Sequence, residues 1–147
     1  MSITSIAGKL FVPRQKELQQ YQNGAEEMQD EVLKYLVNTA ASTEYGRNHL
    51  FKTIHSYDDF AKNVPLNTYE ELKGDIDRMR HGESDILWPG SVKWYAKSSG
   101  TTNDKSKFIP VSHDGLQRVH YQGGKDVVAL YLRNNPNSRL FDGRSLI

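Results

Sequence analysis

KSSGTTNDKSKFIP, residues 97–110, joins a run of hydroxyl side chains to a glycine, two closely spaced lysines and a closing apolar pair. The segments on either side have the composition of strands, so we expect a hydroxyl-rich loop between two strands. A phosphate chain carries several negative charges and many acceptor oxygens. Its binding therefore needs backbone N–H groups that approach closely, hydroxyl donors and at least one cation. The stretch contains all of these and predicts an anion-binding loop.

The candidate ligands of this loop are of three kinds. Gly100 lets the backbone turn where a Cβ would clash, and Lys105 and Lys107 supply positive charge. The hydroxyl donors are Ser98, Ser99, Thr101 and Thr102. The loop is not of the Walker type G-x-x-x-x-G-K-[ST], because no glycine precedes Lys105 and a second lysine follows Ser106. Composition alone also allows a solvated turn, because these residue types are common in turns.

The SSGTT run followed by NDKSKFIP resembles the phosphate-binding motif of the adenylate-forming superfamily of acyl-CoA synthetases, peptide-synthetase adenylation domains and luciferases. Its one-residue-longer form is similar to the Gretchen Hagen Three family, the acyl-acid amido synthetases of plants and their bacterial relatives. Three further segments resemble the N-terminal region of that family: TEYGRNHLF (43–51), YDDFAKNVPLNTYEELKGDIDRMRHGE (57–83) and FDGRSLI (141–147). Asp104 and Ser106 stand where many relatives have glycine and proline.

The resemblance implies a ligase that uses Mg-ATP in two steps. A carboxylate attacks the α-phosphorus and releases pyrophosphate, and an amine such as an amino acid then takes the acyl group and releases AMP. The residues that would bind phosphate are Ser98, Ser99, Gly100, Thr101, Thr102, Lys105 and Lys107. No residue is assigned as a general base, because the carboxylate nucleophile is already ionised at neutral pH.

The helix after the loop is a second candidate site. The resemblance implies that it helps to wall the acyl-substrate pocket, which makes His120, Tyr121 and Gly124 candidates for that wall. Gly123 and Gly124 in mid-helix cost about 1 kcal/mol each relative to alanine. This indicates close approach of another backbone or a ligand, or a kink. The five histidines have no second ligand at a recognisable spacing, so no metal site is predicted.

Residues 1–90 are expected to be mainly helical. Apolar spacing predicts a short amphipathic helix over 3–11, packed on the rest of the protein, which Pro13 interrupts or restarts. A longer helix is predicted over 25–41, where apolar residues recur every four positions. Its apolar positions are Met28, Val32, Leu36 and Ala40. Gly46 in the following turn can take the positive φ that a helix stop often requires.

Two capping patterns predict further helices in this part. Ser56 is followed three residues later by Asp59, and Thr68 is followed in the same way by Glu71. The second helix is expected to run over 69–80, because a histidine and a glycine follow.

Residues 91–147 are expected to hold a strand over 92–96, the loop, a strand at 108–109 and a helix over 112–133. The inner face of that helix is predicted to be Leu116, Val119, Gly123, Val127, Leu130 and Tyr131. A further strand begins at 145–147 and is short of the usual five or six residues. We therefore expect an incomplete α/β domain: the N-terminal part of a large adenylation domain, without its C-terminal domain, and inactive alone.

The 147-residue chain has a formal net charge of +1 at pH 7, with 19 basic and 18 acidic side chains. No block of like charge appears, which argues against a nucleic acid or a membrane surface as the main partner. The absence of cysteine excludes disulfides, thiolate metal sites and a cysteine nucleophile within this sequence. It has no apolar run of membrane-spanning length and no apolar signal-peptide core, so we expect a cytoplasmic protein.

Three classes of function are compatible with these observations. The first is an amide-forming synthetase whose partners are a small carboxylic acid and an amino acid or other amine. The second is an acyl-CoA ligase of the same superfamily, in which coenzyme A discharges the adenylate. The third is a non-catalytic helical interaction or regulatory module, which would be favoured if the full-length protein bound no ATP.

Overall fold

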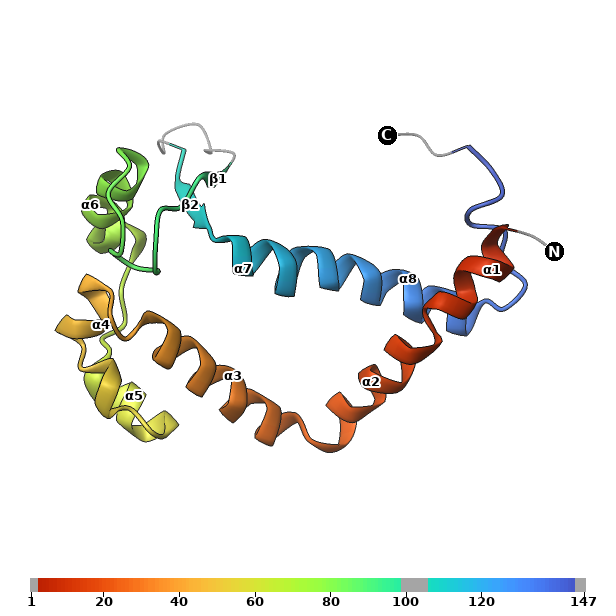
Figure 1. Cartoon of the computed structure of the whole chain (residues 1–147), viewed down its shortest axis with the longest axis horizontal. Helices are drawn as coiled ribbons and strands as arrows, with labels where there is room; N and C mark the ends of the chain where they lie inside the picture. Colours follow the sequence, from red (N-terminus) through yellow and green to blue (C-terminus); the bar gives the residue numbers. More distant parts are fainter. Residues whose placement is uncertain (1–2, 99–105, 145–147) are drawn as a thin grey trace. The chain divides into compact units, whose positions relative to one another are not determined.

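The computed structural model describes residues 3–98 and 106–144, and Figure 1 shows the order of its elements. The elements are α1 (Ile3–Leu10), α2 (Val12–Asn23), α3 (Ala25–Ala40), α4 (Glu44–Asn48), η1 (Phe51–Thr53), α5 (Tyr57–Asn63), α6 (Tyr69–Arg80), β1 (Trp94–Lys97), β2 (Phe108–Val111), α7 (His113–Gly115), η2 (Leu116–Tyr121) and α8 (Gln122–Asn134). Here η1 is a 3-10 turn and η2 is π-helical. The described part is mostly helical with a small antiparallel sheet, as expected for an incomplete α/β domain.

The chain divides into two compact units, Met1–Ala25 with Leu116–Ile147 and Glu26–Gly115. The strand expected at 145–147 lies outside the described residues. Within the described ranges, no helix combines the length and the apolar character that crossing a membrane requires.

The core of the 26–115 unit lies where the end of α3 meets η1. Its buried members are Val37, Ala40, Phe51 and Ile54. The predicted helix is confirmed, and of its predicted apolar positions Ala40 is buried, whereas Val32 and Leu36 are exposed. The side of α3 that packs on the core is formed by Leu33, Val37 and Ala40.

The turn between α3 and α4 is held by Thr43, whose side chain is completely buried. Its hydroxyl donates to the Ala40 carbonyl at 2.7 Å and accepts from the Gly46 N–H at 3.0 Å. The positive φ predicted for Gly46 is wrong, because this residue lies inside α4. Glycine is needed here for another reason, since a Cβ would lie 2.0 Å from the Ala40 carbonyl oxygen.

Both predicted capping patterns start helices. Ser56 and Asp59 exchange hydrogen bonds at the start of α5, at 3.1 and 3.2 Å. At the start of α6 the Glu71 carboxylate accepts from the backbone N–H and the hydroxyl of Thr68, at 2.6 and 2.8 Å. The predicted bounds of α6 are confirmed, and Gly82 follows with a φ of +94°.

The C-terminal half of α6 is tied to α4 by Arg78. Its guanidinium donates to both carboxylate oxygens of Glu44, at 2.9 and 2.7 Å, and to both oxygens of Glu83, at 2.9 and 2.6 Å. Two-pronged bonds of this kind fix orientation as well as distance. The position of α6 relative to α4 is therefore well defined.

In the other unit, α2 packs against α8 through polar contacts. Arg14 donates to both oxygens of Asp126, at 2.5 and 2.8 Å, and the Gln15 amide donates to the Ala129 carbonyl at 3.1 Å. The predicted first helix forms as α1, and it packs on the C-terminal segment of this unit through Thr4, whose hydroxyl accepts a hydrogen bond from the Phe141 N–H at 2.9 Å. Its apolar positions Ile3, Ile6 and Leu10 are exposed, and the buried residue of α1 is Thr4.

The predicted inner face of the last helix is also wrong. Val119 and Val127 are 72% and 69% exposed, whereas Ala129 and Leu132 are buried. The buried side of α8 is the side that faces α2, where Asp126 bonds to Arg14 and the Ala129 carbonyl accepts from Gln15. Apolar spacing alone therefore assigns the wrong side of α8.

Candidate functional site

The candidate loop is closed at its base by two hydrogen bonds between Ser98 and Lys107. The Ser98 N–H donates to the Lys107 carbonyl at 3.0 Å, and the Lys107 N–H donates to the Ser98 hydroxyl at 3.0 Å. These bonds continue the antiparallel register, in which Lys97 lies opposite Phe108. A hydroxyl has one donor and two acceptor sites, so Ser98 keeps the capacity to donate while it accepts this bond.

The structure thus brings two of the predicted phosphate ligands together at the base of the loop. The other five, Ser99, Gly100, Thr101, Thr102 and Lys105, lie outside the described residues. Their roles, and those of Ser98 and Lys107 toward phosphate, stay predictions.

Helix α6 lies beside the β1–β2 pair (Figure 1) and contacts β2. The chain leaves the loop through Lys107 and Phe108, a segment that we call the arm. The Tyr69 hydroxyl accepts a hydrogen bond from the Phe108 N–H at 3.0 Å. The Lys107 ammonium lies 5.4 Å from the centroid of the Tyr69 ring, and the Arg80 guanidinium carbon lies 3.8 Å from that of the Phe108 ring. Both distances are within the range of cation–π contacts.

Sequence reasoning did not find Tyr69 or Arg80 as part of this site. Each stands at one end of α6, 28 or more positions before Phe108, and no local pattern marks a contact over that separation. One indirect signal pointed to Tyr69, which is an aromatic residue at the first position of a capped helix with well-predicted bounds.

The charge of Lys107 is not neutralised by an ion pair within residues 3–98 and 106–144. Arg78 and Arg14, in contrast, each contact carboxylates directly. A cation at the base of a hydroxyl-rich loop, held against an aromatic ring rather than a carboxylate, remains able to attract an anion.

The two faces of the hairpin differ. Tyr95 is half-buried, and burial raises the pKa of its hydroxyl while the nearby Arg80 charge opposes that rise. Trp94 and Ile109, on the opposite face, are 49% and 53% exposed. Trp94 and Tyr95 thus lie on opposite faces of the hairpin, because successive strand residues point to opposite faces.

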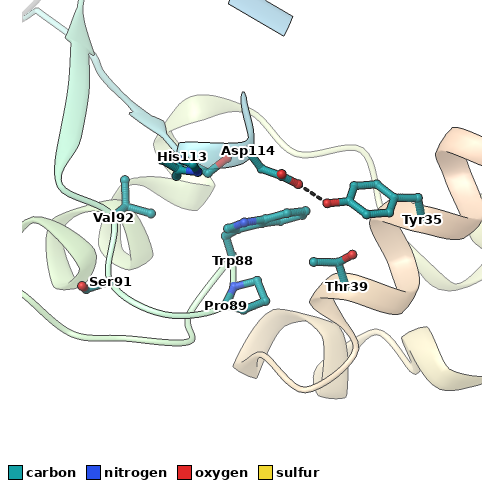
Figure 2. Close-up of a pocket in the computed structure, with 9 residues that line it drawn as sticks. Tyr35, Thr39, Trp88, Pro89, Ser91, Val92, His113 and Asp114 are labelled. Carbon is teal, nitrogen blue, oxygen red and sulfur yellow. Dashed lines mark hydrogen bonds between the residues drawn. The ribbon is translucent and has the colours of Figure 1, made fainter. Parts of the chain in front are cut away.

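A hollow of about 330 Å³ lies at the other end of the hairpin, where the chain passes from β2 into α7. Figure 2 shows the indole of Trp88 beside Tyr35 and Asp114, with the Tyr35 hydroxyl donating to the Asp114 carboxylate. The hollow is lined by Tyr35, Thr39, Trp88, Pro89, Ser91, Val92, Ser112, His113 and Asp114. Its mixed aromatic and hydroxyl lining could accept a small polar molecule. The sequence analysis did not predict this hollow.

The three candidates for an acyl-pocket wall lie on η2 and α8. His120 and Tyr121 are exposed, with their rings in edge contact at 5.5 Å between centroids. An added Cβ at Gly123 or Gly124 would meet no described atom within 4 Å. No other described backbone therefore approaches these glycines closely. The π-helical segment η2 lies immediately before them, which fits the alternative that they accompany a local distortion of the helix. Their role in an acyl pocket stays a prediction.

Comparison of the sequence with known families gives the class of protein to which this chain belongs. The GH3 family N-terminal domain matches residues 14–147. The chain belongs to the GH3 family, which confirms the resemblance drawn from the SSGTT motif.

Several plant enzymes are similar to this chain. The indole-3-acetic acid-amido synthetase GH3.15 of Arabidopsis thaliana is 34% identical over 106 residues, which are 71% of this chain and 18% of the relative. The 4-substituted benzoates-glutamate ligase GH3.12 of the same plant is 29% identical over 73% of this chain and 19% of the relative. The probable indole-3-acetic acid-amido synthetase GH3.2 of Oryza sativa subsp. japonica is 26% identical over 78% and 20%. The chain thus spans about a fifth of the length of these relatives.

Proposed function

We propose that this chain is the phosphate-binding part of an ATP-dependent acyl-acid amido synthetase. Such an enzyme joins a carboxylic acid to an amino acid or another amine. The observation that carries the proposal is membership of the GH3 family, whose relatives are named as amido synthetases and as a benzoates-glutamate ligase. The hydrogen-bonded base of the loop supports a role for this segment in anion binding, because Lys107 there lies against the Tyr69 ring and forms no ion pair with any other described residue.

In the first step a carboxylate oxygen of the acid attacks the α-phosphorus of Mg-ATP. The bond from that phosphorus to its bridging oxygen breaks, and pyrophosphate leaves with the Mg²⁺ that accompanies ATP. Negative charge grows on the leaving group, so hydrogen-bond donors and a cation in fixed positions lower the barrier. Lys107 would provide the cation and Ser98 a hydroxyl donor, and the loop residues between them would complete the set.

In the second step the amine nitrogen attacks the acyl carbon of the adenylate. The acyl–phosphate bond breaks, the amine loses a proton and AMP leaves. AMP is a far better leaving group than hydroxide, which is why the acid is activated first. We propose a small carboxylic acid as the first substrate and an amino acid as the acceptor, in line with the names of the relatives.

Two measurements test this function. The first is binding of Mg-ATP to this chain, in wild type and in Lys107→Ala. The second is acid-dependent ATP–pyrophosphate exchange by a longer polypeptide that contains it. Lys107→Ala should weaken both by about tenfold or more, because one charge-assisted contact is lost. Lys93→Ala is the matched control, since it removes the same charge from an exposed position before β1.

The acceptor is identified by supplying the adenylate with amino acids or with coenzyme A. An amide product supports the proposal, and a thioester product alone would replace it with an acyl-CoA ligase. No exchange with any acid, together with no Mg-ATP binding, would exclude both enzymes.

A further inference from the structure

We propose that Tyr69, with Arg80, is a positioning residue that holds Lys107 in place for the anion. This inference rests on the proposed function, because it assigns Lys107 to the phosphates of ATP. Neither Tyr69 nor Arg80 is given a contact with the nucleotide. Their role is to fix the arm formed by Lys107 and Phe108.

The first step of the argument is the backbone geometry of that arm. In an antiparallel pair, successive residues point their N–H groups alternately toward the partner strand and away from it. The Lys107 N–H points toward the partner strand, where it donates to the hydroxyl of Ser98 just after β1, so the N–H of Phe108 points outward. At that outer edge the Phe108 N–H donates a hydrogen bond to the Tyr69 hydroxyl at 3.0 Å. One side chain therefore pairs a donor that the hairpin itself leaves unpaired.

The second step concerns the side chain of Lys107. A lysine ammonium sits on a flexible stem and normally samples many positions. Here it lies 5.4 Å from the centroid of the same Tyr69 ring whose hydroxyl holds the next residue. The ring attracts the ammonium without neutralising its charge. A cation ordered in this way before the anion arrives binds more tightly, because less freedom is lost on binding.

The third step is the rigidity of the support. Arg80, at the other end of α6, places its guanidinium 3.8 Å from the Phe108 ring centroid, so α6 holds the arm from both of its ends. The helix itself is fixed at its start by the Thr68–Glu71 contacts and near its end by Arg78. A shift of α6 would therefore move the arm through two contacts, that of Tyr69 with Lys107 and Phe108 and that of Arg80 with the Phe108 ring.

The experiment compares three variants of this chain. Tyr69→Phe removes the hydroxyl and keeps the ring, whereas Tyr69→Leu removes both. Tyr57→Phe is the matched control, because Tyr57 is the first residue of its own capped helix and is 69% exposed. Thermal unfolding followed by circular dichroism checks that each variant folds.

The first readout is amide hydrogen exchange at Phe108, measured without nucleotide. Tyr69→Phe should speed exchange at this amide by about tenfold, because its acceptor is gone, and Tyr57→Phe should leave it unchanged. The second readout is the dissociation constant for Mg-ATP. We expect it to rise about 3- to 10-fold in Tyr69→Phe and further in Tyr69→Leu.

In a longer polypeptide with exchange activity, the KM for ATP should rise while the KM for the acid stays constant. A purely structural role would not separate these two constants. Wild-type Mg-ATP affinity in both Tyr69 variants would overturn the inference while leaving the proposed function intact. Failure of the wild-type chain and the longer polypeptide to bind Mg-ATP would overturn the proposed function. It would also overturn the nucleotide part of this inference. Exchange at Phe108 decides by itself whether Tyr69 holds the arm.

Discussion

At Gly46 the packing of α4 against the end of α3 leaves no room for a single methyl group. An added Cβ would lie 2.0 Å from the oxygen and 2.9 Å from the carbon of the Ala40 carbonyl, which is backbone and cannot move aside alone. We expect Gly46→Ala to lower the free energy of unfolding by about 3 kcal/mol, at the upper end of the usual cost of overpacking. Urea unfolding followed by circular dichroism measures this change.

Gly74 gives the matched control for that substitution. It lies in the interior of α6, and an added Cβ there would meet no described atom within 4 Å. Gly74→Ala should raise the free energy of unfolding by about 0.5–1 kcal/mol, because alanine loses less conformational freedom on folding. Equal effects of the two substitutions would show that helix propensity, and not the contact with Ala40, determines the outcome.

Between elements, the contact of α2 with α8 includes an ion pair that is largely shielded from water. The side chains of Arg14 and Asp126 are 18% and 23% exposed, and Arg14 holds the pKa of the Asp126 carboxyl below its usual range. Arg14→Ala should lower the free energy of unfolding by about 2 kcal/mol, because the partly buried carboxylate loses its donors.

The pair of Lys34 with Asp30 is the control, since its side chains are 54% and 52% exposed. Lys34→Ala should change the free energy of unfolding by no more than about 0.5 kcal/mol. Measurement of the Asp126 pKa by NMR adds an independent check, because this pKa should rise toward its ordinary value in Arg14→Ala. An unchanged pKa would show that the guanidinium does not contact this carboxylate in solution.

The elements that the sequence predicted best are those whose signals are local. The bounds of α6 follow from a cap at Thr68 and a histidine and glycine at 81–82, and all of these act within a few residues. The buried face of α8 could not be predicted in this way, because it is set by contacts with Arg14 and Gln15 of α2, which lie 112 and 114 positions from their partners in the sequence. Local signals give an element, but its orientation depends on long-range packing.

The same division applies to the candidate site. The loop was found from its composition, and Ser98 and Lys107 do meet at its base. Tyr69 was not found, because its contact with Phe108 joins residues 39 positions apart. A cluster of hydroxyl and lysine side chains close together in the sequence can be recognised without a structure, whereas Tyr69 and Arg80 are recognised as neighbours of this loop only from the fold.

Helix α8 offers a test of the two explanations for its paired glycines. Because both positions are open to an added Cβ, Gly123→Ala and Gly124→Ala should each raise the free energy of unfolding of this chain by about 0.5–1 kcal/mol. If Gly124 walls an acyl pocket, Gly124→Ala in a longer active polypeptide should also raise the KM for the acid. An unchanged KM would leave local distortion as the explanation for the glycine pair.

At the scale of the whole molecule, carboxyl groups with lowered pKa values link folding to pH. Among the described residues, the pKa lies below its ordinary value in the folded chain for Glu44, Asp59, Glu71, Glu83 and Asp126. Hydrogen bonds from Arg78 lower the pKa values of Glu44 and Glu83, and a hydrogen bond from Arg14 lowers the pKa of Asp126. Backbone N–H groups of His55 and Thr68 act on the two capping carboxylates.

The sign of the effect follows from these directions. As pH falls toward the ordinary values of 4.5 for Glu and 3.8 for Asp, the unfolded chain takes up protons before the folded chain does. Protonation therefore favours unfolding, and the stability that these groups contribute is present above about pH 5 and is lost below that range. We expect the urea midpoint to be nearly constant from pH 7 to 5 and to fall steadily toward pH 3.

The variant Glu44→Gln/Glu83→Gln separates the Arg78 cluster from the other groups. It should already be less stable at pH 7, because the guanidinium loses both charged partners, and its midpoint should fall less between pH 5 and 3 than that of the wild type. Arg78→Lys keeps the charge but not the fork of donors, so it should give an intermediate pH dependence. Parallel curves for all three proteins would mean that the Arg78 contacts do not hold these carboxylates ionised, and that the loss of stability in acid arises at the helix caps and at Asp126.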